Sequence, residues 1–247
     1  MTKRRADVQL VERGLVESRE RAQALIMAGG VFSGTDRIDK PGRLLPTDAP
    51  LEVRQRDHPW VSRGGVKLAH VLDHFSIAID GRVALDVGAS TGGFTDVLLN
   101  HGASRVYTVD VGRGQLDWRL RQDPRVVVLE RTNARYLSEA EVPELVGVIT
   151  CDVSFIGLEA VLPAVLARAA GRNVELIALI KPQFEVGRGQ VGKGGVVRDP
   201  DLHVEVCTRI EAWVAGQSGW MVRGIVESPI TGPSGNKEFL IAAHRAG

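Results

Sequence analysis

The sequence has few of the features that mark secreted or membrane proteins. Its 247 residues include only two cysteines, Cys151 and Cys207, which lie far apart in apolar surroundings. This usage is typical of a reducing compartment and gives no framework of disulfide bonds. The first 13 residues are mostly polar or charged, and no apolar run reaches the roughly 20 residues that span a membrane. We therefore expect a cytoplasmic protein without a leader or a membrane segment.

An excess of charge of one sign is also missing from the chain as a whole. The net charge is +1, and the 44% apolar and 25% charged residues are ordinary for a globular protein. The charge is unevenly spread, however, because residues 1–67 contain 13 Lys or Arg against 9 Asp or Glu. A basic head before a near-neutral body indicates a polyanionic partner.

Complete phosphate-binding motifs are missing, but a glycine turn is present. The segment 84–94 reads ALDVGASTGGF, in which an apolar strand at 83–87 leads into glycines and then a helical pattern at 94–100. Ser90 stands where a dinucleotide-binding motif requires its second glycine, and no Gly-Lys-Ser or Gly-Lys-Thr follows. The turn therefore predicts neither a dinucleotide fold nor a nucleotide-binding P-loop.

Two carboxylates indicate the kind of ligand that the glycine turn would hold. Asp86 precedes the turn, and Asp110, 24 residues later, ends a second strand where a carboxylate can accept both hydroxyls of a ribose. The Asp-x-Gly-x-x-x-Gly-Gly arrangement resembles motif I of S-adenosylmethionine-dependent methyltransferases, in which Asp86 would suit the positive sulfonium. The predicted cofactor contacts are Asp86, Gly88, Ser90, Thr91, Gly92, Gly93, Phe94, Asp110 and Asn133. An ordinary strand-to-helix turn without a ligand, and a turn role for Asn133, are the alternatives.

The second part of the chain alternates strands and helices. Strands are predicted at 83–87, 105–110, 126–129, 147–152, 175–180, 220–227 and 238–242. Helices are predicted between them, notably at 67–75, 158–169 and 200–216. This alternation predicts an α/β fold with a Rossmann-like, mostly parallel seven-stranded sheet and helices on both faces.

The first part predicts a small α+β unit. A helix over 4–15 is followed by a second helix with Ser18 as its N-cap, and short strands begin at Val31 and Leu51. The segments Arg5–Gly14 and Ser18–Gly29 resemble the alpha-L RNA-binding module. The resemblance implies that Arg4, Arg5, Arg19 and Arg21 meet RNA phosphates, whereas charged helices that merely face water are the alternative. The predicted domains are an RNA-binding head at 1–56, a linker at 57–66 and a catalytic domain at 67–247.

Four charged residues stand beside strand ends or at the rim of the predicted sheet. Asp152 and Lys181 end two strands, Glu238 begins the last strand, and Lys67 opens the helix after the linker. A lysine at the end of an apolar strand needs a partner, since a buried unpaired ammonium is costly. These residues match the Lys-Asp-Lys-Glu tetrad of the FtsJ-like 2′-O-ribose methyltransferases. Together with the head, the chain resembles the TlyA, or hemolysin A, family of rRNA methyltransferases.

The resemblance implies a division of roles among these residues. Lys181 would take the proton of a ribose 2′-hydroxyl or steer that hydroxyl, and Asp152 would orient Lys181. Lys67 and Glu238 would hold the ribose and the charge network, and a second ammonium near Lys181 would favour its neutral form. Outside the tetrad, Arg63, Arg188 and Lys193 are predicted RNA contacts, the last two on a glycine-rich loop at 187–195 that could instead be idle.

The family resemblance also implies the partners. We expect S-adenosyl-L-methionine as cofactor, ribosomal RNA or ribosomal subunits as substrate, a monomer, and neither a metal nor a membrane. His70 and His74 have a spacing that can bind metal, but are interpreted as surface residues. The target is expected to be a cytidine of large-subunit rRNA, with small-subunit rRNA left open, because the chain stops soon after its last strand. Two rivals remain: a membrane-active cytolysin and a non-catalytic ribosome-binding factor.

Overall fold

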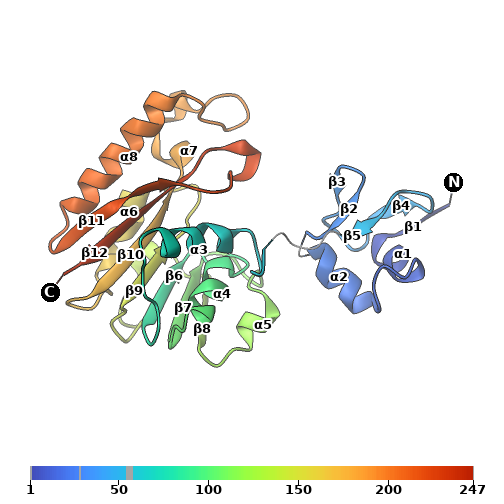
Figure 1. The fold of residues 1–247 in the computed structure, drawn as a ribbon, viewed down its shortest axis with the longest axis horizontal. Helices are drawn as coiled ribbons and strands as arrows, with labels where there is room; N and C mark the ends of the chain where they lie inside the picture. Colours follow the sequence, from blue (N-terminus) through green and yellow to red (C-terminus); the bar gives the residue numbers. More distant parts are fainter. Residues whose placement is uncertain (1, 28, 54–57, 247) are drawn as a thin grey trace. The chain divides into compact units, whose positions relative to one another are not determined.

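The computed structural model describes residues 2–27, 29–53 and 58–246 (Figure 1). The chain divides into two compact units, Met1–Pro59 and Trp60–Gly247. Each unit has its own hydrophobic core. They are therefore described one at a time.

The first unit packs two helices against short strands. The helices are α1 (Ala6–Glu12) and α2 (Arg19–Met27), and the strands are β1 (Lys3–Arg5), β2 (Val31–Ser33), β3 (Asp36–Arg37), β4 (Leu44–Pro46) and β5 (Glu52–Val53). Strand β1 pairs with β4, and β2 pairs with both β3 and β5, all antiparallel. Leu10, Ile26 and Ile38 are fully buried in its core. The predicted N-cap is confirmed, since Ser18 Oγ accepts a hydrogen bond of 3.1 Å from the Arg21 backbone N–H.

The predicted first helix is shorter than expected. Residues 3–5 form β1 rather than a helical turn, because they pair with β4 in the register Lys3↔Pro46 to Arg5↔Leu44. The helix then ends at Glu12, and Gly14 adopts a left-handed φ of 68° that breaks the chain away. Strand pairing to a distant segment overrides a helical pattern that is weak at its ends.

The second unit is built on a seven-stranded sheet, as predicted. Its strands are β6 (Val83–Val87), β7 (Arg105–Asp110), β8 (Val126–Glu130), β9 (Val148–Cys151), β10 (Val174–Ile180), β11 (Trp220–Glu227) and β12 (Phe239–Arg245). The strand order is β11-β12-β10-β9-β6-β7-β8, and β12 runs antiparallel to both of its neighbours. The other pairings in the sheet are parallel. This is the mostly parallel α/β sheet that the sequence predicts.

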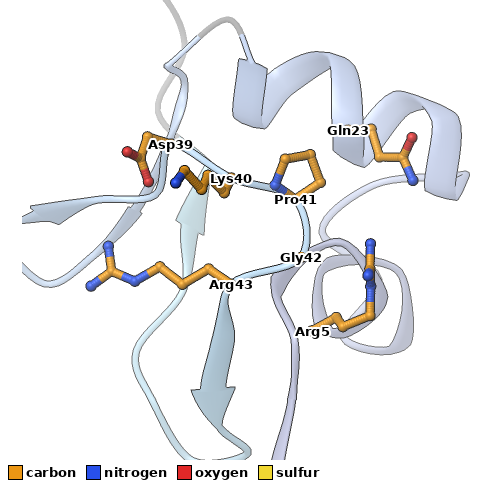
Figure 2. A pocket seen from close by; sticks show the side chains of 7 residues that line it. All are labelled: Arg5, Gln23, Asp39, Lys40, Pro41, Gly42 and Arg43. Carbon is orange, nitrogen blue, oxygen red and sulfur yellow. The ribbon is translucent and has the colours of Figure 1, made fainter.

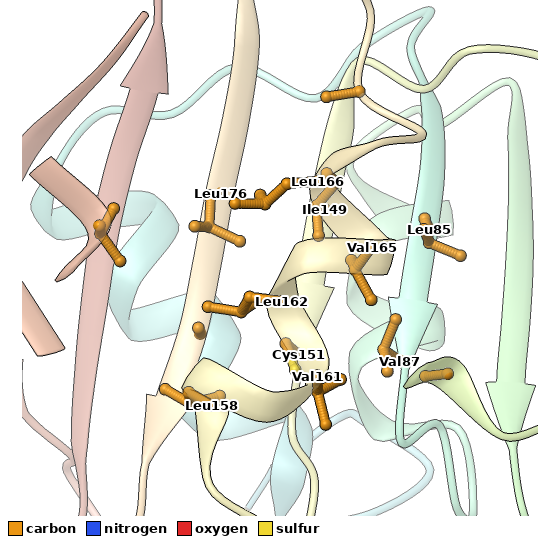
Figure 3. Close-up of a cluster of buried hydrophobic side chains, with 14 of the residues drawn as sticks. Leu85, Val87, Ile149, Cys151, Leu158, Val161, Leu162, Val165, Leu166 and Leu176 are labelled. Carbon is orange, nitrogen blue, oxygen red and sulfur yellow. The ribbon is translucent and has the colours of Figure 1, made fainter. Parts of the chain in front are cut away.

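Helices cover both faces of this sheet. The α-helices are α3 (Gly64–His74), α4 (Gly93–Asn100), α5 (Trp118–Arg121), α6 (Leu158–Leu166), α7 (Pro182–Glu185) and α8 (Pro200–Ala215), with short 3₁₀ turns at Ala134–Tyr136, Arg188–Gln190 and Pro233–Gly235. Figure 3 shows α6 laid on the sheet, with Leu158, Leu162 and Leu166 facing strand residues such as Ile149 and Leu176. Along β6 the side chains alternate, so that Leu85 and Val87 join this cluster while Ala84 joins the cluster under α3 and α4.

The segment predicted as a linker differs from expectation over residues 60–66. Val61 is buried, and its backbone N–H donates to Asp96 Oδ2 at 2.8 Å. Helix α3 already begins at Gly64, three residues before the predicted start of this helix at Lys67. A Cβ at Gly65 would lie 2.4 Å from the Trp60 ring, so this glycine is required by close packing rather than by a loop.

Candidate active site

The carboxyl edge of the sheet has a natural opening between β6 and β9. From β6 the chain continues to β7 on one side, whereas β9 lies on the other side. Ligands of open parallel sheets bind at such a switch point. The two strand ends approach closely there: a Cβ at Gly88 would lie 2.3 Å from the carbonyl oxygen of Asp152. Only a glycine allows the turn after β6 to pass this close to the chain leaving β9.

Lys181 stands at this edge with two oxygen partners. It follows β10 directly, and its Nζ lies 2.5 Å from Asp152 Oδ1 and donates to Ser154 Oγ at 2.9 Å. The ammonium is almost completely buried, so these partners replace the water that it loses. A protonated lysine has three N–H donors. One of them is donated to Ser154, whereas Asp152 Oδ1 contacts Nζ as an ion pair and, among the described residues, receives no aligned hydrogen bond.

Lys67 and Glu238 form the second ion pair of the site. They are 171 positions apart in the sequence, yet Lys67 Nζ lies 2.5 Å from Glu238 Oε2, and both side chains are buried. Lys67 comes from the first turns of α3, and Glu238 directly precedes β12. The antiparallel register pairs Ile180 with Phe239. The next facing positions are therefore those of Lys181 and Glu238, which brings both ion pairs to the same edge.

One oxygen of Glu238 has a special environment. Oε1 is buried and, among the residues that the structure describes, has no hydrogen-bond donor. It packs against Gly232, where an added Cβ would lie only 2.1 Å away. The Gly-Pro-Ser-Gly-Asn segment before β12 thus leaves the space that this carboxylate fills. A buried acceptor without a donor is costly unless a ligand supplies one.

Sequence reasoning missed Ser154 and Phe155, which follow Asp152. Phe155 has a φ of 67° and is 90% exposed, and its ring lies 5.0 Å from that of Phe184 on α7. A left-handed φ is strained for an aromatic residue, and such strain gathers at functional sites. The signal in the sequence was the Asp-Val-Ser-Phe run after an apolar strand. An exposed ring that directly follows Ser154, a partner of Lys181, is available for stacking.

Asp110 organises the glycine turn, as its position after β7 suggested. Its Oδ2 accepts from the backbone N–H of Ser90 at 2.8 Å, and its Oδ1 accepts from that of Gly112 at 2.6 Å. Each oxygen keeps a free lone pair. A hollow beside them is lined by Ala89, Ser90, Thr108, Asp110, Gly112, Gln115, Leu116, Val128 and Glu130. The apolar lining residues offer a surface for a flat ring, and the carboxylates offer acceptors for hydroxyls.

Asp86 does not face this hollow. Its carboxylate is fully buried, accepting from Thr95 Oγ1 at 2.6 Å and from Thr150 Oγ1 at 2.9 Å. Burial raises the pKa of Asp86 to about 6, although both threonine hydroxyls act in the opposite direction. The structure gives Asp86 a position beneath the glycine turn, where its side chain joins β6, α4 and β9, and its predicted role toward the cofactor stays a prediction.

Among the other predicted cofactor residues, some pack in the interior and others lie at the surface or in a turn. Phe94 points into the core below α3 and α4, and Gly93 lies so close to Ser62 that a Cβ would approach its Oγ to 2.3 Å. Gly92 has a φ of 92° and packs against α5. Thr91 is exposed beside them. Asn133 accepts from the Arg135 backbone N–H at 3.1 Å, which is the turn role that was left open.

Of the predicted RNA contacts in the first unit, two arginines share one carboxylate and the other two lie apart from it. Arg5 and Arg19 both pair with Asp7, while Arg4 pairs with Glu12 and Arg21 is exposed on α2. In the second unit, Arg63 and Lys193 are exposed, Arg63 one turn before Lys67 on α3. The side chain of Arg188 lies outside the described part of the chain.

The chemistry of these groups suits the nucleoside part of S-adenosylmethionine. The Asp110 carboxylate offers acceptors for ribose hydroxyls, and the apolar lining offers a surface for the adenine ring. The hollow lies at the ends of β6, β7 and β8, and β6 is the neighbour of β9. In residues 2–27, 29–53 and 58–246 no cluster of three or more His, Cys, Asp or Glu side chains is arranged to hold a metal ion. Over those ranges no helix combines the length and apolar character that a membrane span requires.

Comparison with known proteins gives matches over both units. The FtsJ-like methyltransferase family model matches residues 60–245, and the S4 domain model matches residues 4–49. The chain is 49% identical to the 16S/23S rRNA (cytidine-2′-O)-methyltransferase TlyA of Mycobacterium tuberculosis, over 96% of this chain and 88% of that protein. It is 36% identical to the 23S rRNA (cytidine-2′-O)-methyltransferase TlyA of Campylobacter jejuni, over 81% and 76%. A solved structure of a hemolysin-like protein from Streptococcus thermophilus has a TM-score of 0.76 at 41% identity, covering 100% of this chain and 90% of that one.

Proposed function

Because the chain belongs to the FtsJ-like methyltransferase family and carries an S4 domain, we propose that it methylates a ribose 2′-hydroxyl of ribosomal RNA. It is a methyltransferase enzyme whose methyl donor is S-adenosyl-L-methionine. The observation that carries the proposal is the pairing of Lys67 with Glu238 and of Lys181 with Asp152 at the carboxyl edge of the sheet. These pairs stand at the same carboxyl edge of the sheet as the hollow beside Asp110.

Lys181 is the residue that would contact the reacting hydroxyl. Asp152 and Ser154 hold its amine at the sheet edge. The cofactor would supply a methyl group on a sulfonium sulfur, with the neutral thioether as the leaving group. In its neutral form the Lys181 amine would accept a hydrogen bond from the ribose 2′-hydroxyl, hold that oxygen in line and receive its proton as the new O–C bond forms.

The second ion pair would hold the substrate sugar. Lys67 and Glu238 are buried together, and Glu238 Oε1 is an acceptor for which the described residues supply no donor. A hydroxyl or amino group of the bound nucleotide would satisfy it. Phe155, exposed beside Ser154, would stack on an unpaired base, which fits an RNA nucleotide turned out of its helix.

The head would supply affinity for RNA. S4 domains are RNA-binding modules, and Arg5 and Arg19 present guanidinium groups on this unit. Arg63 and Lys193 would add phosphate contacts on the catalytic unit. We propose a cytidine of large-subunit rRNA as the target, because both TlyA relatives are named for 23S rRNA and cytidine. Small-subunit rRNA is the second target to test.

The test is transfer of labelled methyl to separate large and small ribosomal subunits and to free rRNA. Alkaline hydrolysis then locates the product, since a 2′-O-methyl group blocks cleavage at its own phosphodiester. Lys181→Ala is expected to lower turnover by roughly a hundredfold or more while cofactor and RNA still bind. Arg172→Ala, which changes an exposed cation at the opposite end of β10 from Lys181, serves as the matched control for turnover. Label in a base instead of a ribose, or near-normal turnover of Lys181→Ala, would contradict the proposal.

A further inference from the structure

The first unit contains a buried carboxylate with an unusual number of donors. Asp7, in the first turn of α1, is fully inaccessible to solvent. Its Oδ1 accepts from Arg5 Nε and from the Val8 backbone N–H, and its Oδ2 accepts from Arg5 Nη2, Arg19 Nε and Gln23 Nε2, all at 3.0 Å. Five donors thus meet on two oxygens of one side chain.

These contacts keep Asp7 ionised and hold its partners in place. The two-point hydrogen bond from Arg5 holds the pKa of Asp7 well below its usual range, although burial acts against this. Arg5 and Arg19 are each about half exposed. A guanidinium has five N–H donors, so each arginine has donors left for a second anion after its contact with Asp7.

Arg5, which makes two hydrogen bonds to Asp7, borders a hollow of the first unit. Figure 2 shows Arg5 and Gln23 lining it together with Lys40, Gly42 and Arg43, and its volume is about 630 Å³. The Arg5 guanidinium lies over Gly42, where an added Cβ would be 3.2 Å from Nη1. Here three cations stand around one hollow, with Asp39 as the acid among the lining residues.

Asp7 also ties the rim of this hollow to α1. Its backbone N–H donates to Pro41 O at 3.1 Å, and the N–H of Ala6 donates to Arg43 O at 2.9 Å. The backbones of Ala6 and Asp7 therefore anchor the turn that carries Lys40 and Arg43. The side chain of Asp7 binds Arg5 and Gln23, which line the same hollow. Such a frame orients donors before a ligand arrives, which lowers the entropic cost of binding.

We propose that Asp7 is a positioning residue for RNA binding, which fixes Arg5, Arg19 and Gln23 in the orientation that meets RNA phosphates. The inference rests on the proposed function, because the ligand is the rRNA substrate. The inference and simple electrostatics predict opposite effects of removing the Asp7 charge on RNA affinity. A negative charge near RNA weakens binding, so electrostatics alone predicts that its removal increases the affinity. If Asp7 positions the arginines, its removal decreases the affinity.

The test measures the binding of full-length protein to rRNA-containing subunits at several salt concentrations. Asp7→Asn is expected to weaken binding roughly tenfold, although the variant is more positive, and to reduce the salt slope by about 1 for each phosphate that the misplaced arginines no longer meet. Glu12→Gln is the matched control: it removes a negative charge of the same helix, one that pairs with exposed Arg4. This control is expected to bind as well as the wild type or more tightly.

A double-mutant cycle separates positioning from a general loss of structure. In an Arg5→Ala, Arg19→Ala, Gln23→Ala background, Asp7→Asn is expected to have no further effect on RNA affinity, since the three groups that it orients are gone. An equal loss of affinity in that background, or tighter binding by Asp7→Asn alone, would overturn the inference. If instead the wild-type protein shows no saturable binding to rRNA or to subunits, the proposed function fails and not only the role of Asp7.

Discussion

Replacing Asp86 by Asn tests the claim that this carboxylate supports the fold beneath the glycine turn. Asn has nearly the same shape and can still bond to Thr95 and Thr150, the two hydroxyls that contact Asp86. The substitution therefore removes a buried charge with little change in packing. Its effect on stability should depend on pH in a way that the buried environment dictates.

The sign follows from the direction of the shift. The folded state raises the pKa of Asp86 from 3.8 to about 6, so between these values the folded protein binds more protons than the unfolded chain. The contribution of Asp86 to the free energy of unfolding of the wild type is therefore highest at low pH and falls as the pH rises toward 6. A shift of about 2 units corresponds to roughly 3 kcal/mol in full, of which roughly 2 kcal/mol falls between pH 4 and pH 8.

The assay is urea unfolding of cofactor-free wild type and Asp86→Asn across this pH range. All four tryptophans, Trp60, Trp118, Trp213 and Trp220, lie in the second unit, so their fluorescence reports on that unit alone. We expect Asp86→Asn to gain roughly 2 kcal/mol relative to wild type from pH 4 to pH 8, with an unchanged denaturant slope. A difference that stays constant with pH, or that moves in favour of the wild type, would refute the reasoning.

Two further predictions concern the packing around Glu238 and the reactivity of the two thiols. Gly232→Ala should lower turnover at least tenfold in a folded protein, because its Cβ would meet Glu238 Oε1 and disturb the pair with Lys67. Gly189→Ala is the control and should act as wild type, because nothing lies within 4 Å of a Cβ there; equal kinetics of both variants would show that the carboxylate can move. In native protein at pH 8, a maleimide should label half-buried Cys207 slowly and fully buried Cys151 hardly at all. The reason is that burial raises the pKa of Cys207 to about 11 and the pKa of Cys151 still further. Rapid loss of both thiols without unfolding would contradict the described core.

Most of the sheet could be predicted because buried parallel strands have a simple pattern. Strand β10 is inaccessible along its whole length, and after Glu175 it appears in the sequence as an unbroken apolar run. The ends of such strands are marked by the first polar residue, which is why Asp152 and Lys181 were recognised as neighbours of the sheet edge. The short β1 and β3 carry no such signal, since two or three exposed residues form a strand only through their partners.

The parts that sequence reasoning missed depend on contacts between distant segments. The linker was predicted to reach residue 66, yet α3 already begins at Gly64, and Trp60 lies too close to Gly65 for any side chain there. Asp86 was assigned to the cofactor from its motif, although alternation along β6 places it on the side of Ala84, toward α4. Its threonine partners come from α4 and β9, and no local pattern predicts both.

The charge balance of the site limits what stability measurements can say about catalysis. Two ammonium groups and two carboxylates are held together at the sheet edge, and three of the four side chains are almost completely buried. Removing one member of such a pair leaves a buried charge without a partner, which destabilises a fold whatever the chemistry of the site. A loss of stability in Lys67 or Glu238 variants is therefore expected from folding alone. Only kinetic measurements on folded variants, at saturating RNA and cofactor, can assign the four residues to methyl transfer.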